Sequence, residues 1–391
     1  MRLAQRVRDV SGSSTLEITA KAKKLRQEGF DVIGFSAGEP DFDTPEFIKE
    51  SAVNAIHLGF TKYTPSSGIP ELKQAISLKF EKDNNLNYST SQVIVSCGAK
   101  HSLYNVIQVL VDRGDEVIIP APYWVSYPEM VKLAEAKSVI LKTLPQDNFK
   151  INIRNLERAI NSRTKLLVLN SPANPTGSVY TRNELEQIAK VCVKHRIFVL
   201  SDEIYEKLIY DDQEHVSIGS LNNDIYKLTI TVNGVSKTFS MTGWRIGYSG
   251  APEEIARAVT NLQDHSTSNP VSISQKAALT ALEAPSEWAE KLRGEFLKRR
   301  NCMMESLDKI PGLSYVKPQG AFYIFCNISK TGLRSDEFAR RLLEDEKVAL
   351  IPGSGFGADD HVRLSFCVNC DAIIKGCSRI EKWVKQLPKK S

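Results

Sequence analysis

Two stretches, KLLVLNSPANPTG (165–177) and IFVLSDEIYE (197–206), decide the fold of this chain. Each begins with a nearly unbroken apolar run, which is typical of parallel strands that are covered on both faces. Each run ends in polar residues or turn formers. These polar groups would therefore lie at the carboxyl edge of a sheet, where ligands of open α/β proteins bind. The two stretches are predicted to lie at the centre of that sheet.

Further strand candidates continue outward from this pair in both directions. Helical stretches, such as 182–195, separate most of them. Such alternation of strands and helices indicates an α/β fold with a doubly wound, mainly parallel sheet. The additional strands are predicted at 92–97, 116–119, 138–142, 228–232 and 246–250.

The last third of the chain has a different pattern, with long helices followed by short strands predicted at 321–326, 348–351 and 362–366. This pattern favours a second, smaller α+β domain. A helix predicted at 14–29 needs a packing partner, and the last third offers one. We therefore divide the chain into an N-terminal arm with part of the small domain (1–44), a large domain (45–295) and a small C-terminal domain (296–391).

The composition is that of a soluble globular protein: 42% of the 391 residues are apolar and 25% are charged. This length is typical of two domains. The formal charge of +5 results from 51 basic and 46 acidic side chains, which is too small an imbalance to indicate a nucleic-acid partner.

The cysteines and the chain ends predict a cytoplasmic protein. Seven scattered cysteines are expected to be free thiols in a reducing compartment. The N-terminus, MRLAQRVRDVSGSS, has no apolar core of a secretory signal, and no apolar run is long enough to span a membrane. Cys367 and Cys370 form a C-x-x-C, but no second ligand pair stands at zinc-site spacing, so no metal is predicted.

An amine beside an anion site is suggested by NGVSKTFSMTGWRIG (233–247). Ser236 and Arg245 could both hold a phosphate, the arginine through a charge-assisted pair of hydrogen bonds. Lys237 would lie next to that phosphate. The alternative is a solvated loop with ordinary basic residues.

Three polar residues follow the two central strands. Asp202 could keep a pyridinium nitrogen protonated, and Tyr205 could bind the phenolic oxygen of the same ring. Asn174, presented by a rigid turn with two prolines, could donate to an oxyanion. The alternatives for Asp202 and Tyr205 are a helix cap and a packed tyrosine.

Two more stretches could contribute to the same edge. In VSCGAKHSLYNVI a glycine turn opens a helix and directs the backbone amides of Ala99 and Lys100 towards an anion. In PYWVSYPEM the flat side chain of Trp124 could stack on a ring.

The window 234–247 matches the lysine-attachment signature of class I and II aminotransferases at every defined position, so the chain resembles that family. SPANPTG, SDEIYE, AGEPDFDTP, KYTPSSG and PYWVSYPE resemble its other blocks, in the family's order. Within the family, the chain looks closest to the bacterial aspartate aminotransferases. The resemblance implies a fold type I enzyme that uses pyridoxal 5'-phosphate. It also implies a homodimer with active sites at the subunit interface.

The resemblance assigns roles in cofactor binding to ten residues. They are Lys237 as the Schiff-base lysine, Asp202 at the pyridine nitrogen, Tyr205 and Asn174 at the phenolic oxygen, Trp124 stacked on the ring, and Ala99, Lys100, Ser236, Arg245 and the other subunit's Tyr63 at the phosphate.

The substrate is expected to bind beside the cofactor. Arg363, in HVRLSF, would hold the α-carboxylate, with Gly38 closing over it and with Trp124 and Asn174 beside it. Lys100 is the candidate cation for a second carboxylate. The alternatives are a surface arginine on an edge strand and a solvent-facing lysine at a helix start.

The implied reaction moves an amino group between aspartate and 2-oxoglutarate, giving oxaloacetate and glutamate. Broader or aromatic specificity and β-elimination on the same cofactor are the enzymatic alternatives, because fold does not determine reaction outcome. A cofactor-binding regulatory domain is a third alternative, disfavoured because the family region begins almost at residue 1. Relatives that accept prephenate carry a lysine where this chain has Ser11, so activity on prephenate is not expected.

Overall fold

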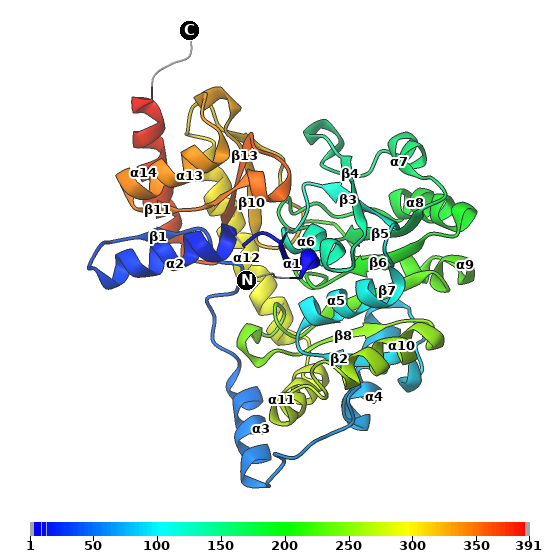
Figure 1. Ribbon diagram of the computed structural model, residues 1–391. Coiled ribbons are helices and arrows are strands. Elements are labelled where there is room, and N and C mark those ends of the chain that lie inside the picture. Colours follow the sequence, from blue (N-terminus) through cyan, green and yellow to red (C-terminus); the bar gives the residue numbers. More distant parts are fainter. Residues whose placement is uncertain (1–3, 9, 13, 388–391) are drawn as a thin grey trace.

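The computed structural model describes residues 4–8, 10–12 and 14–387. Its larger part is built on a seven-stranded sheet (Figure 1). All seven strands predicted for this sheet are confirmed. They are β2 (Val93–Ser96), β3 (Glu116–Ala121), β4 (Lys137–Lys142), β5 (Thr164–Asn170), β6 (Phe198–Asp202), β7 (Thr229–Gly234) and β8 (Gly247–Gly250).

The strands lie in the order β2-β8-β7-β6-β5-β3-β4, with β8 antiparallel to both of its neighbours and the other pairs parallel. The predicted mainly parallel sheet is therefore confirmed, and β5 and β6 lie at its centre. Asn170 pairs with Asp202 in register. As a result, both central strands end at the same edge.

Both faces of this sheet are covered by helices, which explains the apolar character of the central strands. Leu166 and Val168 of β5 pack on one face, and Leu167 and Leu169 pack on the other. The first face is covered by α5 (Ala99–Leu110), α6 (Ser126–Leu133) and α10 (Glu253–Asp264), and the second by α3 (Glu46–His57), α4 (Pro70–Asn84), α7 (Ile153–Ala159), α8 (Arg182–His195), α9 (Asn223–Tyr226) and α11 (Ser272–Glu283).

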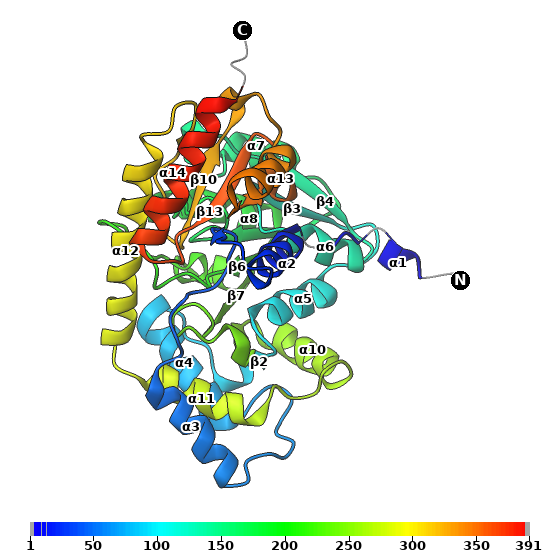
Figure 2. The same cartoon turned by 90° about the vertical axis from the view of Figure 1, so that its left-hand side faces the viewer.

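The smaller part contains an antiparallel sheet in the order β12-β13-β10-β9 and a separate parallel pair, β1-β11. Because β1 pairs with β11, the N-terminal segment lies beside the C-terminal elements, as both views show (Figures 1 and 2). The elements of this part are α2 (Ser14–Gln27), β1 (Ile33–Gly34), β9 (Ser314–Tyr315), β10 (Tyr323–Asn327), α13 (Ser335–Glu346), β11 (Val348–Ala349), β12 (Ile351–Pro352), β13 (His361–Ser365) and α14 (Cys370–Gln386). A short helix, α1 (Gln5–Arg8), precedes them.

Helix α12 (Glu287–Leu307) runs without a break past the boundary predicted after residue 295. Its residues from Leu292 to Leu307 contribute to the same apolar core as β10 and α14. A single helix therefore joins the two parts, and no loop in the sequence marks the transition.

The predicted free thiols are confirmed for all seven cysteines. No helix in the described ranges is long and apolar enough to cross a membrane.

Candidate active site

A cavity of about 250 Å³ opens at the carboxyl edge of the large sheet, against the smaller part. The polar residues that the sequence predicts at this edge line it together, although they come from distant parts of the chain. The cavity contains Gly38, Ala99, Lys100, Trp124, Asn174, Asp202, Tyr205, Ser236, Lys237, Arg245 and Arg363, with Leu103, Val125, Ser126, Tyr127, Asn170, Ile204, Thr242 and Tyr323.

Lys237 follows β7 and directs its amine into the cavity. Its Nζ donates to the backbone oxygen of Gly38 at 2.6 Å. Burial lowers the pKa of Lys237 to about 8, and the cations of Arg363 and Arg245 act in the same direction. The amine can therefore supply a neutral, nucleophilic form near neutral pH.

Asp202 is the last residue of β6 and is buried beneath the cavity. Tyr127 Oη donates to one carboxylate oxygen at 2.6 Å, and the amide of Ile204 donates to the other at 3.3 Å. Burial raises the pKa of Asp202 to about 6 although both donors lower it. A cationic ring nitrogen at this carboxylate would compensate for its burial.

Arg363 lies on β13 between β12 and β10 and is only 2% exposed. The structure thus excludes a surface arginine on an edge strand. Its Nη1 donates to Asn174 Oδ1 and its Nη2 to the backbone oxygen of Ser36, both at 3.0 Å. Its buried Nε has no partner among the described residues. Arg363 also lines the cavity, where its guanidinium could bind an anionic ligand.

Tyr205 and Tyr323 form a pair, of which the sequence predicts only Tyr205. Their hydroxyls are 2.9 Å apart, and the Arg363 guanidinium lies 4.3 Å from the centre of the Tyr323 ring. Tyr323 stands on a strand of the smaller part, so no local pattern near the other site residues marks it. It connects Arg363 to Tyr205.

One end of the cavity is formed by the start of α5. The amides of Ala99 and Lys100 belong to its first turn, where amides have no partner within a helix. Arg245 reaches this turn and donates to the backbone oxygen of Cys97 at 3.2 Å. A Cβ added to Gly98 would stand 2.2 Å from the Arg245 guanidinium, and one added to Gly247 would stand 2.0 Å from the Ala99 nitrogen. Only glycine allows this close approach.

Trp124 and Lys100 lie against each other at the cavity wall. The Lys100 Nζ is 4.8 Å from the centre of the Trp124 ring, and partial burial, with the nearby Arg245, lowers the pKa of this lysine. Lys100 therefore lines the cavity, where a second substrate carboxylate could reach it.

Tyr63 is the one predicted site residue that does not line the cavity. It is 91% exposed and precedes α4. The structure does not bring it to the site of its own chain.

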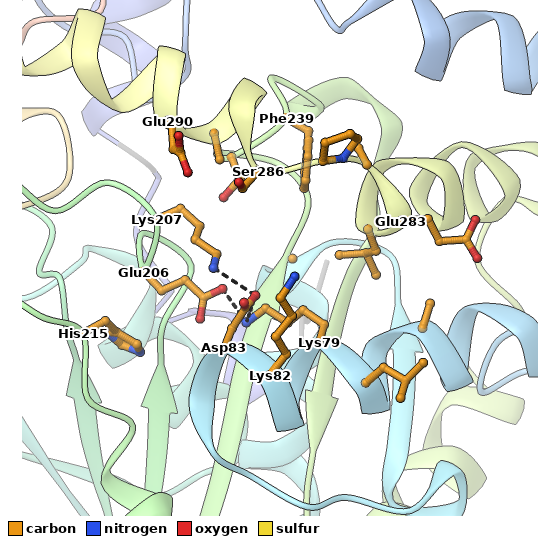
Figure 3. A pocket seen from close by; sticks show the side chains of 18 of the residues that line it. Lys79, Lys82, Asp83, Glu206, Lys207, His215, Phe239, Glu283, Ser286 and Glu290 are labelled. Atoms are coloured by element: carbon orange, nitrogen blue, oxygen red, sulfur yellow. Dashed lines mark ion pairs between the residues drawn. The ribbon is translucent and has the colours of Figure 1, made fainter.

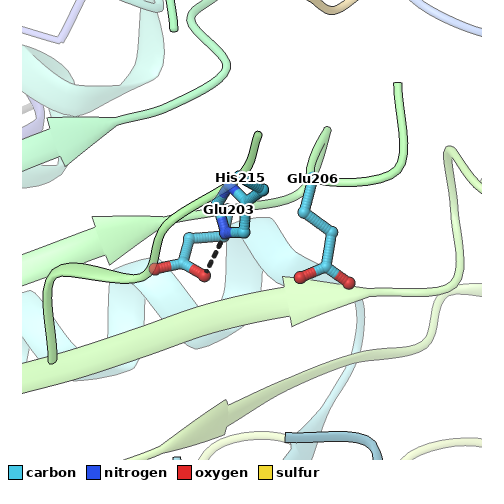
Figure 4. Close-up of side chains that lie close together, drawn as sticks. All are labelled: Glu203, Glu206 and His215. Atoms are coloured by element: carbon cyan, nitrogen blue, oxygen red, sulfur yellow. Dashed lines mark hydrogen bonds and ion pairs between the residues drawn. The ribbon is translucent and has the colours of Figure 1, made fainter. Parts of the chain in front are cut away.

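A second polar cluster lies on the side of the chain that faces away from the active-site cavity, because the side chains of successive residues in a strand point to opposite sides. Asp202 faces the cavity, whereas Glu203 faces the other way and pairs with His215 at 2.8 Å (Figure 4). Asn84 donates to Glu206 at 2.8 Å. The cluster borders a larger cavity of about 810 Å³ between α4 and the start of α12 (Figure 3).

Glu203, Glu206 and His215 bring potential metal ligands within 4.8 Å of one another, a grouping that the sequence analysis did not predict. Lys79, however, forms an ion pair with Glu206, and His215 pairs with Glu203. Protein cations therefore already compensate both carboxylates. We interpret the cluster as a buried ion-pair network that ties α4 to the segment after β6.

This network predicts a pH dependence of stability. Burial alone would lower the pKa of His215, but Glu203 raises it, and the net direction is upward. The stabilisation is therefore fully present below the unfolded pKa of about 6.5 and is lost as the pH rises through the folded pKa. Urea unfolding at pH 6 and pH 9 is expected to show a loss of about 1–2 kcal/mol in the wild type that His215→Gln lacks. Equal losses of unfolding free energy between pH 6 and pH 9 in both proteins would contradict this prediction.

Comparison with known proteins agrees with this geometry along the whole chain. The family model for aminotransferase class I and II matches residues 31–380. The chain is 51% identical to the aspartate aminotransferase of Bacillus subtilis, covering 99% of this chain and 100% of that protein. It is also 51% identical to that of Geobacillus stearothermophilus, with coverages of 98% and 99%.

Solved structures give the same result for the fold. The aspartate aminotransferase of Thermus thermophilus with maleate superposes with a TM-score of 0.94 at 44% identity, covering 98% of this chain and 100% of that one. The enzyme of Rhizobium meliloti reaches 0.95 at 38% identity, with coverages of 99% and 100%. These enzymes have fold type I, which is therefore the fold of this chain. Its sequence, architecture and cavity all lead to one conclusion: the chain belongs to the class I and II aminotransferase family.

Proposed function

We propose that this chain catalyses reversible amino transfer between L-aspartate and 2-oxoglutarate, giving oxaloacetate and L-glutamate. The observation that carries the proposal is that Lys237 and Arg363 line the same cavity. A lysine with a lowered pKa and a buried arginine line the same space. An amino acid needs both groups: one for its α-proton and one for its α-carboxylate.

Pyridoxal phosphate is used throughout this family, and the residues present fit it. Its ring withdraws electrons from the α-carbon of the joined amino acid and so weakens the Cα–H bond. Asp202 would hold the ring nitrogen, Trp124 would stack on the ring, and Tyr205 with Asn174 would bind the phenolic oxygen. The first turn of α5, Ser236 and Arg245 would hold the phosphate. The buried anion of Asp202 and the amides beside Gly98 support this orientation.

Lys237 would act twice in the reaction. Its amine would hold the cofactor through a covalent link, and as a free amine it would take the α-proton from the substrate and hold it for return. Its amine stands 2.6 Å from the Gly38 oxygen, beside the segment that bears Ser36 and the hydrogen bond to Arg363. Arg363 would orient the α-carboxylate so that the α-hydrogen faces this amine.

A donor panel compared by kcat/KM tests the preference for aspartate. Two carboxylates on one substrate require two cations, and Lys100 is the second beside Arg363. We expect aspartate to lead in the wild type. In Lys100→Ala it should lose about tenfold or more, whereas alanine and phenylalanine should lose less, because only aspartate has the second carboxylate. Since one lysine discriminates less sharply than a guanidinium fork, weak activity on neutral or aromatic donors is compatible with the proposal.

Lys132→Ala provides the matched control for this panel, since Lys132 lies on α6 outside the cavity lining. An aromatic or aliphatic donor that leads in the wild type would contradict the proposal. So would equal losses for all donors in Lys100→Ala. Glutamate formation from 2-oxoglutarate separates amino transfer from β-elimination.

We further propose that the enzyme is a cytoplasmic homodimer in which Tyr63 completes the phosphate site of the partner subunit. Its 91% exposed side chain, outside the cavity of its own chain, supports this role. Exposed apolar side chains on the neighbouring helix, at Val53 and Ile56, support an association surface there. The prediction that prephenate is not accepted rests on Ser11 and is retained as part of this proposal.

A further inference from the structure

The buried tyrosine beneath the site is not among the residues that the family resemblance assigns. Tyr127 is 2% exposed and stands in the first turn of α6. Its hydroxyl donates to Asp202 Oδ2 at 2.6 Å, a short bond of the kind formed with an ionised acceptor. Its ring packs edge-on against Trp124, with the ring centres 5.3 Å apart. One side chain therefore supports both the ring-stacking residue and the ring-nitrogen residue.

The surroundings of Asp202 set opposing demands on its charge. Burial favours the neutral acid, and the neighbouring Glu203 carboxylate acts in the same direction. The Tyr127 hydroxyl, the Ile204 amide and the Lys237 cation favour the carboxylate, whereas the buried hydroxyl of Tyr205 carries no charge. Of the two hydrogen-bond donors, only Tyr127 comes from another element. Tyr127 therefore reaches Asp202 through tertiary packing, whereas the Ile204 amide reaches it through local chain geometry.

We propose that Tyr127 is a positioning residue that keeps Asp202 ionised and in the rotamer that faces the ring nitrogen. The inference rests on the proposed function, because it concerns the carboxylate that would hold the cofactor. A neutral Asp202 could not stabilise a protonated ring, so the electron withdrawal on which proton removal depends would fall. Tyr127 does not contact the reacting atoms; it acts through Asp202.

Tyr127→Phe isolates this role. The ring belongs to a core with Leu103, Met130 and Val131, and phenylalanine preserves that packing and the contact with Trp124. Tyr88→Phe is the matched control: Tyr88 is also 2% exposed in the same domain, but its hydroxyl lies 3.2 Å from the neutral Thr231. Both variants lose one buried hydroxyl, and only one of them loses a bond to a charge.

The first measurement uses the cofactor-free protein. Infrared titration would follow the carbonyl band of a buried neutral carboxylic acid, assigned to Asp202 by its absence in Asp202→Asn. The loss of a hydrogen bond to the ionised form should raise the titration midpoint by about one to two pH units in Tyr127→Phe. The Tyr88→Phe midpoint should equal that of the wild type. An unchanged midpoint in Tyr127→Phe would overturn the proposal.

The second measurement uses the holoenzyme. For Tyr127→Phe we expect the rate of α-proton removal from aspartate to fall about 10- to 100-fold, with the acid limb of the pH profile displaced upward. Tyr88→Phe should keep the wild-type profile. Equal rate losses and unshifted profiles in both variants would reduce Tyr127 to a packing residue and refute its positioning role.

The two measurements also distinguish this inference from the proposed function. A wild-type protein without amino transfer would refute the proposed function, yet the titration would still test the bond between Tyr127 and Asp202. An active wild type with an unshifted Tyr127→Phe titration would refute only the inference.

Discussion

Replacing Lys237 by alanine is expected to abolish the covalent link to the cofactor and nearly all amino transfer. In the proposed mechanism the lysine would both form this link and move the α-proton, and general acid–base catalysis alone contributes up to about 10⁴-fold. We therefore expect kcat/KM for aspartate to fall by at least about 10⁴-fold. The measurement is borohydride reduction followed by peptide mapping, together with steady-state kinetics.

Lys150→Ala is a suitable control for this experiment. Lys150 is 7% exposed, pairs with Glu184 and is not part of the cavity lining. Its loss should leave the trapped cofactor on the peptide that contains residue 237. Reduced cofactor that persists on another lysine in Lys237→Ala would show that the assignment is wrong.

Replacing Asp202 by asparagine should produce the second largest effect. Asparagine preserves the shape of the side chain but removes the charge that would keep the ring nitrogen protonated. The cofactor should still bind, because the proposed phosphate contacts at α5, Ser236 and Arg245 remain. Proton removal from aspartate should slow by about 10²- to 10³-fold, as for the loss of a single preorganised charge-stabilising group. Single-turnover kinetics with the cofactor loaded would measure this step.

Glu116→Gln controls for the loss of a buried carboxylate. Glu116 is 2% exposed at the opposite end of the sheet, where it binds Asn161 at 2.7 Å and Arg163 at 2.8 Å. This variant should lose stability but keep its turnover number. Near-normal turnover in Asp202→Asn would instead show that Asp202 is a structural cap, held by its bond with the Ile204 amide.

Much of the fold could be predicted because it depends on local patterns. A strand that is apolar on both faces must be covered on both faces, and such strands, separated by helices, lead to a parallel sheet. The sequence therefore predicts that the residues that end β5 and β6 lie at one edge. The direction of β8 could not be predicted, since both orientations bury the same apolar side chains.

The tertiary structure decided which distant residues meet. The β13 strand carries Arg363 more than 120 residues after Lys237, and only the packing of the smaller part against the sheet brings the two into one cavity. The same packing brings Tyr323 into this cavity. The spacing to Trp124 is a local signal for Tyr127, which follows it by three residues in the first turn of α6. Its bond to Asp202, however, depends on how α6 docks on the sheet.

The sequence by itself therefore determined the central sheet, the polar residues at its carboxyl edge and the family signature around Lys237. These features follow from burial and turn chemistry within short segments. The three-dimensional structure decided the electrostatics of the site: the lowered pKa of Lys237, the buried Asp202 and the buried guanidinium of Arg363. Desolvation and hydrogen bonding act between groups that are distant in the chain, so these properties exist only once the two parts pack together.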